Sequence, residues 1–381
     1  MLPSNCDVLV VGAGPTGLVT AVALARRGVD VTVVDRVAKG HNTSRANGVH
    51  ARTLEVLATL GAARPLVEQG VPATRVTLRD HDRTLLTMRF DDLPTPFPYV
   101  LLVPQSVTEK VLLDRLTALG GRVLRPYPVV GLVADGTGAR VSFAGGETVR
   151  ARYVVGADGV HSTVRRLAGI DFPGTDSAQS FVLADIRVDT ALPRDELVLF
   201  LSRTGLLVWA PLPNGSIRIV AEVDDPPEHP DVAYAQSLLD ARGPTARRST
   251  VTELLWGSRF RVHHRVAESF RAGPVLLAGD AGHVHSPAGG QGMNLGLRDG
   301  VALADALADV LSGAPETVLD GYATNRRSVA REVVGFAERL TRIGTTPPAL
   351  RPLRNAALRL LSSRPAARGR VVGRLAGLTD R

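Results

Sequence analysis

The segment DVLVVGAGPTGLVTAVALARRGVDVTVVDR, residues 7–36, constrains the fold of this chain more than any other feature. Its uncharged apolar run at 8–11 is typical of a parallel strand that is buried on both faces. Gly12, Gly14 and Gly17 follow as G-x-G-x-x-G. The first glycine permits a tight turn, the second lets a pyrophosphate approach the backbone, and the third lets the helix lie close to the strand. We expect the helix to end at Gly28 and a second strand to end on Asp35.

Asp35 stands eighteen residues after Gly17, where an acid can accept hydrogen bonds from a ribose hydroxyl. Strand, turn, helix, strand and acid in this order predict a dinucleotide site. The alternative is a glycine-rich turn in an ordinary α/β domain that binds nothing. The segment does not distinguish NAD from FAD, because both present the same adenosine ribose and pyrophosphate.

The net charge of +8 is confined to the end of the chain. Residues 341–381 hold nine arginines and one acid, which leaves 36 basic and 36 acidic residues in the rest. A neutral body predicts no nucleic-acid binding. An apolar helical stripe of Leu350, Leu353, Ala357, Leu360 and Leu361 indicates docked helices with an exposed arginine face, although a membrane surface or an acidic partner is an alternative.

Cys6 is the single cysteine, which excludes internal disulfides and a cysteine-rich metal site. Its place at the head of the first strand favours a buried thiol without a chemical role. We find no signal-peptide pattern and no apolar run of transmembrane length, so a cytoplasmic protein without a transmembrane segment is expected.

The rest of the chain indicates an α/β nucleotide domain interrupted by a mainly antiparallel sheet. The segment 44–61 is typical of a loop that runs into an amphipathic helix, which ends at Gly61. A second helix should begin at about Ser106, with Glu109 in the capping-box position. A hairpin turns at Gly145-Gly146. Short alternating strands fill 173–269, before PVLLAGD at 274–280 returns to a parallel strand. The predicted domains are 1–72, 98–172 and 270–340 for the nucleotide, 73–97 and 173–269 for the substrate, and 341–381 as basic C-terminal helices.

Two further motifs separate FAD from NAD. They are YVVGADGVHSTVRRLAGI at 153–170 and PVLLAGDAGHVHSPAGGQGMNLGLRDGVALADAL at 274–307. With the first glycine motif, and with SRANGVHARTLEVL and VPQSVTEKVL, they make residues 5 to about 340 resemble the FAD-dependent aromatic hydroxylases. These are single-component flavoprotein monooxygenases with the p-hydroxybenzoate hydroxylase fold. Many relatives that oxidise aromatic polyketides carry a C-terminal thioredoxin-like domain, which we do not expect here.

The second motif also suits a flavin on physical grounds. Asp280 at a strand end can accept hydrogen bonds from the ribityl chain, which NAD lacks. Glycines at 289, 290 and 292 leave N–H groups open at a helix start, where the positive end of the helix dipole stabilises a flavin ring that gains negative charge. The alternative is a plain helix-start loop.

The resemblance implies a role in FAD binding for each matching residue. It assigns the pyrophosphate to Gly12, Gly14, Thr16 and Gly17, the adenosine to Asp35, Arg36 and the backbone of Val130, the phosphate and ribityl region to Arg45 and Gln105, the ribityl chain to Asp280 beside Gly279, and the isoalloxazine to Gly292, Met293 and Asn294. Asp158 and Gly159 match a motif that serves both FAD and NADPH. His283 and His285 lack a third ligand nearby, so we expect structural roles for them and no metal site.

The resemblance also implies a reaction. NADPH or NADH reduces non-covalent FAD, O2 adds at C4a of the flavin, and the hydroperoxide passes its terminal oxygen to an electron-rich ring. Pro287, Ala288 and Gly289 should lie near the oxygen-transfer site, whereas no residue is assigned as the catalytic base. With one nucleotide unit present, NAD(P)H should bind transiently along a surface groove, with Arg45 as a candidate.

The substrate should be a small phenol or, by preference, a polycyclic aromatic metabolite of secondary metabolism. Phe181, Phe200 and Trp209 are candidates for its wall, although apolar strand residues are more often core. A homodimer is possible. Two rival functions stay open: an FAD-dependent reductase or other oxidoreductase of the same fold, and a non-catalytic dinucleotide-binding protein.

Overall fold

The first glycine segment forms the expected unit within a mainly parallel sheet. In the computed structural model, which describes residues 1–39 and 46–379, β1 (Asn5–Val11) leads into α1 (Pro15–Arg26) and then β2 (Val31–Val34). β1 pairs in parallel with β2 and with β11 (Thr148–Gly156). The sheet order is β17-β18-β11-β1-β2-β8, with β17 (Arg271–Ala272), β18 (Val275–Leu277) and β8 (Val123–Leu124). β9 (Val129–Asp135) and β10 (Gly138–Phe143) extend it as an antiparallel hairpin arm.

Helices cover this sheet and bury its strands. The first core includes side chains from β1, β2, β11 and β18 together with the apolar faces of several helices. These helices are α1, α2 (Ala51–Thr59), α3 (Ala63–Val67), α4 (Gln105–Ala118), α5 (Thr163–Leu167), α7 (Gln291–Leu311) and α8 (Thr317–Gly344). Cys6 belongs to this core, and burial raises the pKa of its thiol to about 11, as suits a structural residue.

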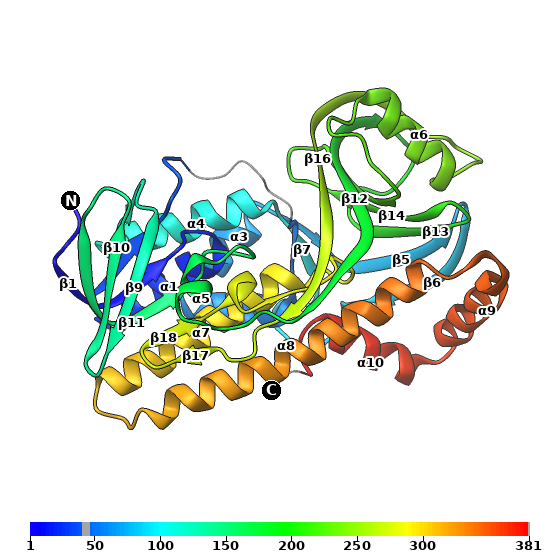
Figure 1. The fold of residues 1–381 in the computed structure, drawn as a ribbon. Coiled ribbons are helices and arrows are strands. Elements are labelled where there is room, and N and C mark those ends of the chain that lie inside the picture. The colour runs from blue at the N-terminus through cyan, green and yellow to red at the C-terminus, as the bar shows by residue number, and fades with distance from the viewer. Residues whose placement is uncertain (40–45, 380–381) are drawn as a thin grey trace.

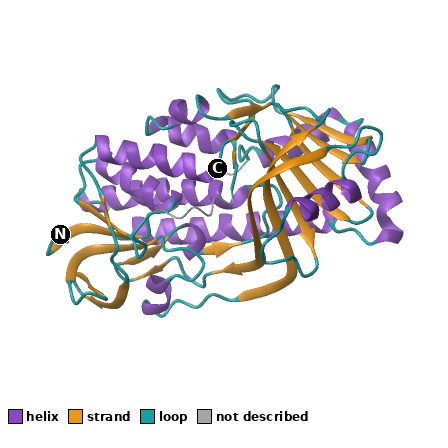
Figure 2. Ribbon diagram, turned by 90° about the horizontal axis from the view of Figure 1, so that it is seen from above, coloured by secondary structure: helices purple, strands orange, loops and turns teal. Residues whose placement is uncertain are grey.

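A second, mainly antiparallel sheet stands beside the first, as expected from the alternating strands (Figures 1 and 2). Its order is β19-β16-β12-β15-β14-β13-β5-β6. The strands are β5 (Arg75–Asp80), β6 (Arg83–Arg89), β12 (Gly174–Asp189), β13 (Leu197–Ser202), β14 (Gly205–Pro211), β15 (Ile217–Val223), β16 (Thr250–Val266) and β19 (His283–Val284). A small third sheet joins β3 (Gly48–Val49), β7 (Val100–Leu102) and β4 (Val71–Ala73).

The two faces of the second sheet have different covers. One face packs on α6 (Val232–Arg242). Part of the other face packs on the end of α8 and on α9 (Arg351–Ser362) and α10 (Pro365–Leu375). Figure 1 shows α8 running beneath both sheets, with α9 and α10 folded back under the second. α8 thus continues to Gly344, across the expected boundary at 340, while the domain boundaries themselves stay a prediction.

The basic C-terminal helices are docked, but the predicted apolar stripe is wrong at four of its five positions, since only Leu361 packs against a core. Leu350, Leu353 and Leu360 are 54%, 70% and 53% exposed. The buried face of α9 instead holds Leu358 and Arg354, whose Nη2 donates to the carbonyl of Leu201 at 2.9 Å. An arginine can take this place because its aliphatic stem packs while its guanidinium satisfies an open carbonyl.

Among residues 1–39 and 46–379, no helix is both long and apolar enough to cross a membrane.

Candidate active site

The three glycines of the first motif divide into two kinds. A Cβ on Gly12 would lie 2.3 Å from the carbonyl oxygen of Ala157, and one on Gly17 would lie 1.9 Å from that of Gly12. These two positions therefore exclude any side chain. A Cβ on Gly14 would meet nothing within 4 Å. Gly14 is the N-cap of α1, and no side chain caps that helix, so its first N–H groups are open to an anion such as a pyrophosphate.

Asp35 lies just after β2, as predicted. Its Oδ2 accepts the N–H of Ala13 at 2.8 Å, and its Oδ1 accepts that of Val37 at 3.0 Å and lies 3.4 Å from Nη1 of Arg125. The carboxylate is 14% exposed and keeps acceptor capacity for a ribose hydroxyl. The N–H of Tyr127 donates to the carbonyl of Asp35, so the chain that enters β9 lies beside it.

The other predicted adenosine residues lie at the surface around Asp35. Arg36 is exposed, and Val130, in β9, is 58% exposed.

The second motif meets the first in space. Gly279 follows β18 with φ +62°, and a Cβ there would lie 2.4 Å from Oγ1 of Thr16. Gly296 of α7 approaches the same hydroxyl equally closely. Asp280 is exposed although both of its neighbours are buried.

Asp35 and Asp280 follow strands of one parallel sheet, at the same edge. The sheet order places β11 and β1 between β18 and β2. Three strand spacings of about 4.8 Å separate the two strands by about 14 Å. A ligand held by both carboxylates must therefore be elongated, as a dinucleotide is.

A buried ionic cluster supports the loop that carries Asp280. Asp299 is fully buried in α7, and its carboxylate accepts hydrogen bonds from Nε2 of His283 at 2.6 Å, Nε of Arg326 at 2.7 Å and the N–H of Gly279 at 3.3 Å. Burial alone would raise the pKa of Asp299, but the charges of Arg326 and His283 outweigh burial and hold it below its usual value. Because the N–H of Gly279 donates to Asp299, the cluster holds the backbone of the loop that carries Asp280.

His283 is a buried member of this cluster, and its structural role stays a prediction. His285 contacts the carbonyl of Ser286 through Nδ1 at 2.8 Å. Within the part of the chain that the structure describes, no group of three or more His, Cys, Asp or Glu side chains could hold a metal ion.

The start of α7 offers a second open helix N-terminus. Its N-cap, Gly290, has φ +64° and supplies no side-chain cap, and a Cβ on Gly292 would meet nothing within 4 Å. The open N–H groups fit a ring that gains negative charge. Met293 is half-buried and packs against the first core.

Asn294 is 1% exposed, and its amide is engaged within the protein. Its Oδ1 accepts the N–H of His50 at 2.8 Å, and its Nδ2 donates to the carbonyls of Gly48 and Gly290, both at 2.8 Å. The side chain therefore ties the segment before α2 to the start of α7. A cofactor at this place would meet the backbone that Asn294 positions.

Asp158 holds the first turn of α5 (Thr163–Leu167), whose N-cap is Ser162. Its Oδ2 accepts the N–H groups of Thr163 at 2.7 Å and Val164 at 3.1 Å, at the start of α5. Gly159 beside it has φ +82°, and a Cβ there would meet nothing within 4 Å. The carboxylate of Asp158 is thus engaged by the protein backbone, whereas the space beside Gly159 is free of protein atoms.

Gln105 begins α4, and its N–H donates to the carbonyl of Ala46 at 3.0 Å. The predicted capping box is wrong: Pro104 is the N-cap, no side chain caps the helix, and Glu109 accepts from Nε2 of Gln105 at 2.9 Å. The segment 46–47 beside α4 contains Nδ2 of Asn47, a buried donor that has no partner among residues 1–39 and 46–379. Arg45 lies outside the described residues.

The predicted substrate wall is wrong for Phe200 and Trp209. Both are fully buried on the sheet face that packs against α6. Their strands alternate, and a shift of one residue moves a side chain to the opposite face. Phe181 lies outside that core and stacks on Phe260, with ring centroids 5.5 Å apart.

Sequence reasoning missed the ion pair on the opposite face to Trp209. Arg218 of β15 is 1% exposed, and its Nε and Nη2 donate to the carboxylate of Asp185 at 2.7 and 2.8 Å. Its Nη1 lies 3.4 Å from the carbonyl of Ala46, and its guanidinium lies 5.6 Å from the ring of Trp256. The arginine inside the alternating run SIRIVAEV was the sequence signal that could have revealed this ion pair. His50 and Asp299 stand inside two of the quoted motifs, but nothing in the sequence indicated their roles, because each contacts groups that lie farther along the chain.

Comparisons with known proteins agree with this geometry. A family model described as an FAD binding domain matches residues 5–337. Rifampicin monooxygenase of Streptomyces venezuelae is 38% identical over 355 residues, covering 90% of this chain and 72% of that protein. 6-Methylpretetramide 4-monooxygenase of Streptomyces rimosus is 40% identical over 366 residues, covering 92% of this chain and 64% of that protein.

Solved structures show the same similarity over the whole chain. Anhydrotetracycline hydroxylase from Streptomyces rimosus superposes with a TM-score of 0.81 at 33% identity, covering 99% of this chain and 77% of that one. p-Nitrophenol 4-monooxygenase from Pseudomonas putida superposes with a TM-score of 0.88 at 26% identity and full coverage of both chains. The chain therefore belongs to the FAD-binding-domain family and, within it, to the flavin-dependent monooxygenases of aromatic compounds.

Proposed function

We propose that this protein binds FAD non-covalently and uses NAD(P)H and O2 to hydroxylate a phenolic or polycyclic aromatic molecule. One observation carries the cofactor site: two helices with open N-termini, α1 and α7, meet the same sheet edge at which Asp35 and Asp280 stand. FAD, when bound, supplies the redox chemistry and the activation of O2, and the protein supplies binding, orientation and a dry site.

The adenosine half of FAD would lie over α1. Gly14 leaves room for the pyrophosphate at the open N–H groups, while Asp35 accepts hydrogen bonds from the ribose. Gly12 and Gly17 act indirectly, because their missing side chains allow the turn and the close helix contact.

The flavin half would lie at the start of α7. Asp280 would accept from the ribityl hydroxyls, and the open N–H groups beside Gly292 would face the pyrimidine edge of the ring. Pro287, Ala288 and Gly289 precede this helix and would border the oxygen-transfer site.

We place the aromatic substrate against the sheet face that carries Phe181, Arg218 and Trp256. Arg218 supports this choice because it joins that face to the carbonyl of Ala46, next to the segment that Asn294 holds. An aromatic wall that contains one buried arginine–aspartate ion pair is suited to a flat phenolic molecule.

NAD(P)H would act as a transient co-substrate. The glycine-rich unit at 7–36 is assigned to FAD, and the strand β18 belongs to the same cofactor's second half, so the nicotinamide is expected to bind at the surface and leave after hydride transfer. Homodimer formation and a cytoplasmic location stay predictions.

Steady-state oxidation of NADPH and of NADH by the FAD-loaded protein, with and without candidate phenols, tests the proposal. We expect O2 consumption that rises with a suitable phenol and a product heavier by one oxygen atom. Reduction of a substrate double bond without O2 uptake would indicate a reductase of the same fold. Tight cofactor binding with no turnover of either nicotinamide over a broad aromatic panel would contradict the proposal.

A further inference from the structure

The loop before α7 is held by side chains from two other segments. Residues 286–290 include two consecutive glycines, Gly289 and Gly290, with φ +85° and +64°. Thr341 of α8 donates to Oγ of Ser286 at 2.8 Å, and Nε2 of His50 lies 2.9 Å from the carbonyl of Gly289. Glycine-rich backbone loses much conformational entropy on ordering, so this loop depends on its partners for a single conformation.

The end of the last helix supplies a further set of partners. Gln291, 3% exposed, donates through Nε2 to the carbonyl of Leu375 at 3.0 Å and to that of Gly289 at 3.3 Å. The N–H of Arg52 donates to the carbonyl of Ala376 at 3.1 Å. Residues 375–377 thus contact both the loop that precedes α7 and the start of α2.

Apolar contacts reinforce these hydrogen bonds. A Cβ on Gly289 would lie 2.9 Å from Cδ1 of Leu340 and 3.6 Å from Cδ2 of Leu375. The guanidinium of Arg374 lies 4.7 Å above the ring of Phe336.

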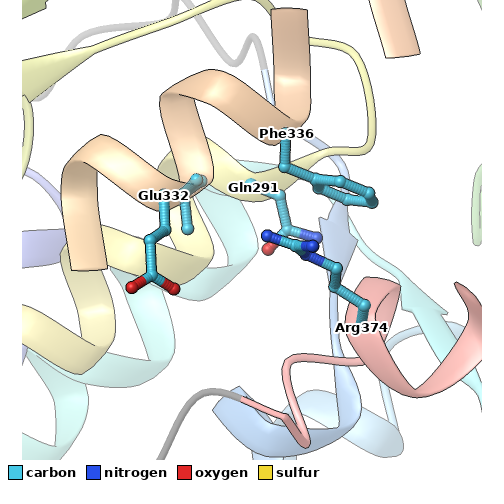
Figure 3. Close-up of a pocket in the computed structure, with 5 residues that line it drawn as sticks. Gln291, Glu332, Phe336 and Arg374 are labelled. Carbon is cyan, nitrogen blue, oxygen red and sulfur yellow. The ribbon is translucent and has the colours of Figure 1, made fainter. Parts of the chain in front are cut away.

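Figure 3 shows Gln291, Phe336 and Arg374 converging from α7, α8 and α10. The space left among them is about 10 Å³, room for one water molecule. The side chains of α7, α8 and α10 therefore fill nearly all of the space between the three helices.

We propose that residues 375–377 are a clamp on the loop 286–290, and that Gln291 is the positioning residue through which the clamp acts on oxygen transfer. The role in oxygen transfer rests on the proposed function. Gln291 links the clamp to the loop, because its Nε2 donates both to the carbonyl of Leu375 and to that of Gly289. The same loop contains the turn in which the N–H of Gly290 donates to the carbonyl of Pro287 at 2.9 Å. A loop that opens admits water, and water diverts activated oxygen to hydrogen peroxide.

The decisive variant is Gln291→Met, which keeps the shape of the side chain and removes both donated bonds. Gly377→Val is a second variant, which should displace residues 375–377 themselves. Gly377 has φ +72°, and a Cβ there would lie 3.3 Å from Cβ of Arg52 and 3.2 Å from Nη1 of Arg298. Gln236→Met is the control at a distant site, because Gln236 in α6 donates to Asp240 and to the carbonyl of Ser249 and accepts the N–H of Val251.

The first measurement is amide hydrogen exchange of residues 286–293 in the full-length protein, with and without FAD. We expect about tenfold faster exchange in Gln291→Met and Gly377→Val, equivalent to about 1.4 kcal/mol for an unmade buried hydrogen bond, and no change in the control. The second measurement is the share of oxidised NAD(P)H that appears as hydrogen peroxide, which should rise in both variants with an unchanged KM for NAD(P)H.

Unchanged exchange at 286–293 in both variants would overturn the clamp. Faster exchange with an unchanged peroxide share would overturn the positioning role of Gln291. If the wild-type protein consumes no NAD(P)H, the proposed function fails, and the exchange measurement still tests the clamp. If Gln291→Met does not fold, Gly377→Val still gives both measurements, the hydrogen exchange and the peroxide share, by a change within residues 375–377.

Discussion

His50 should make the protein lose stability in mild acid. The side chain is 6% exposed, and its Nε2 lies 2.9 Å from the carbonyl oxygen of Gly289. Because a carbonyl only accepts, Nε2 carries the proton and Nδ1 of the neutral ring is left without a partner among the described residues. Burial is the main cause that lowers the pKa of His50 from 6.5 to about 4, and the charge of Arg298 adds to it.

The magnitude follows from the two pKa values. In the unfolded chain the ring binds a proton below pH 6.5, whereas in the folded protein it stays neutral down to about pH 4. Between these values the unfolded state binds more protons, so the free energy of unfolding decreases as the pH falls. The full difference is about 3 kcal/mol, present above pH 6.5 and lost by pH 4.

The perturbation is His50→Gln, which keeps an amide donor for Gly289 and cannot titrate. Urea unfolding of wild type and variant across this pH range measures the free energy of unfolding. The wild-type curve should fall below that of the variant by most of the 3 kcal/mol as the pH approaches 4. His285→Gln is a useful companion, since burial also lowers the pKa of His285 to about 4. Parallel curves for wild type and His50→Gln would refute the reasoning.

Three further predictions concern the cofactor site. Gly14→Ala should fold with normal stability and lose FAD affinity, because the new Cβ meets only open space in the protein, whereas Gly17→Ala should impair folding; thermal unfolding and FAD titration of both variants check this. Asp280→Ala should lose FAD occupancy in purified protein, since each charge-assisted bond to a ribityl hydroxyl contributes about 1.5–3 kcal/mol, and unchanged occupancy would mean that the second motif is misplaced. Asp299→Ala should lower the free energy of unfolding by about 3–5 kcal/mol because it leaves buried charges unpaired. Asp305 is on the same helix as Asp299 and forms a half-exposed pair with Arg27 of the segment after α1. Asp305→Ala should cost less than about 1 kcal/mol, and equal losses in the two variants would contradict the role of the buried cluster.

Local patterns in the sequence determined the elements that depend on neighbours along the chain. The unit at 7–36, the helix that ends at Gly61 and the hairpin at Gly145-Gly146 could be predicted because turns need glycine at defined places and strands need a regular apolar pattern. The two carboxylates at strand ends followed from the same logic, since parallel strands present their carboxyl ends at one edge.

Only the tertiary structure decided which face a side chain occupies and which distant groups it meets. The wall assigned to Phe200 and Trp209 failed because strand alternation alone does not say which face looks toward the cofactor domain. The apolar stripe of the last helices failed because Arg354 found an open carbonyl at Leu201, a contact across more than a hundred residues. Gln291 with Leu375 is likewise a partnership between remote segments. Asp299 meets His283 and Arg326 over shorter separations, but a loop or a helix boundary lies between them, so the sequence does not fix their distance in space. A hydrogen bond depends on distance in space, and spacing along the chain constrains that distance only within a turn or a helix.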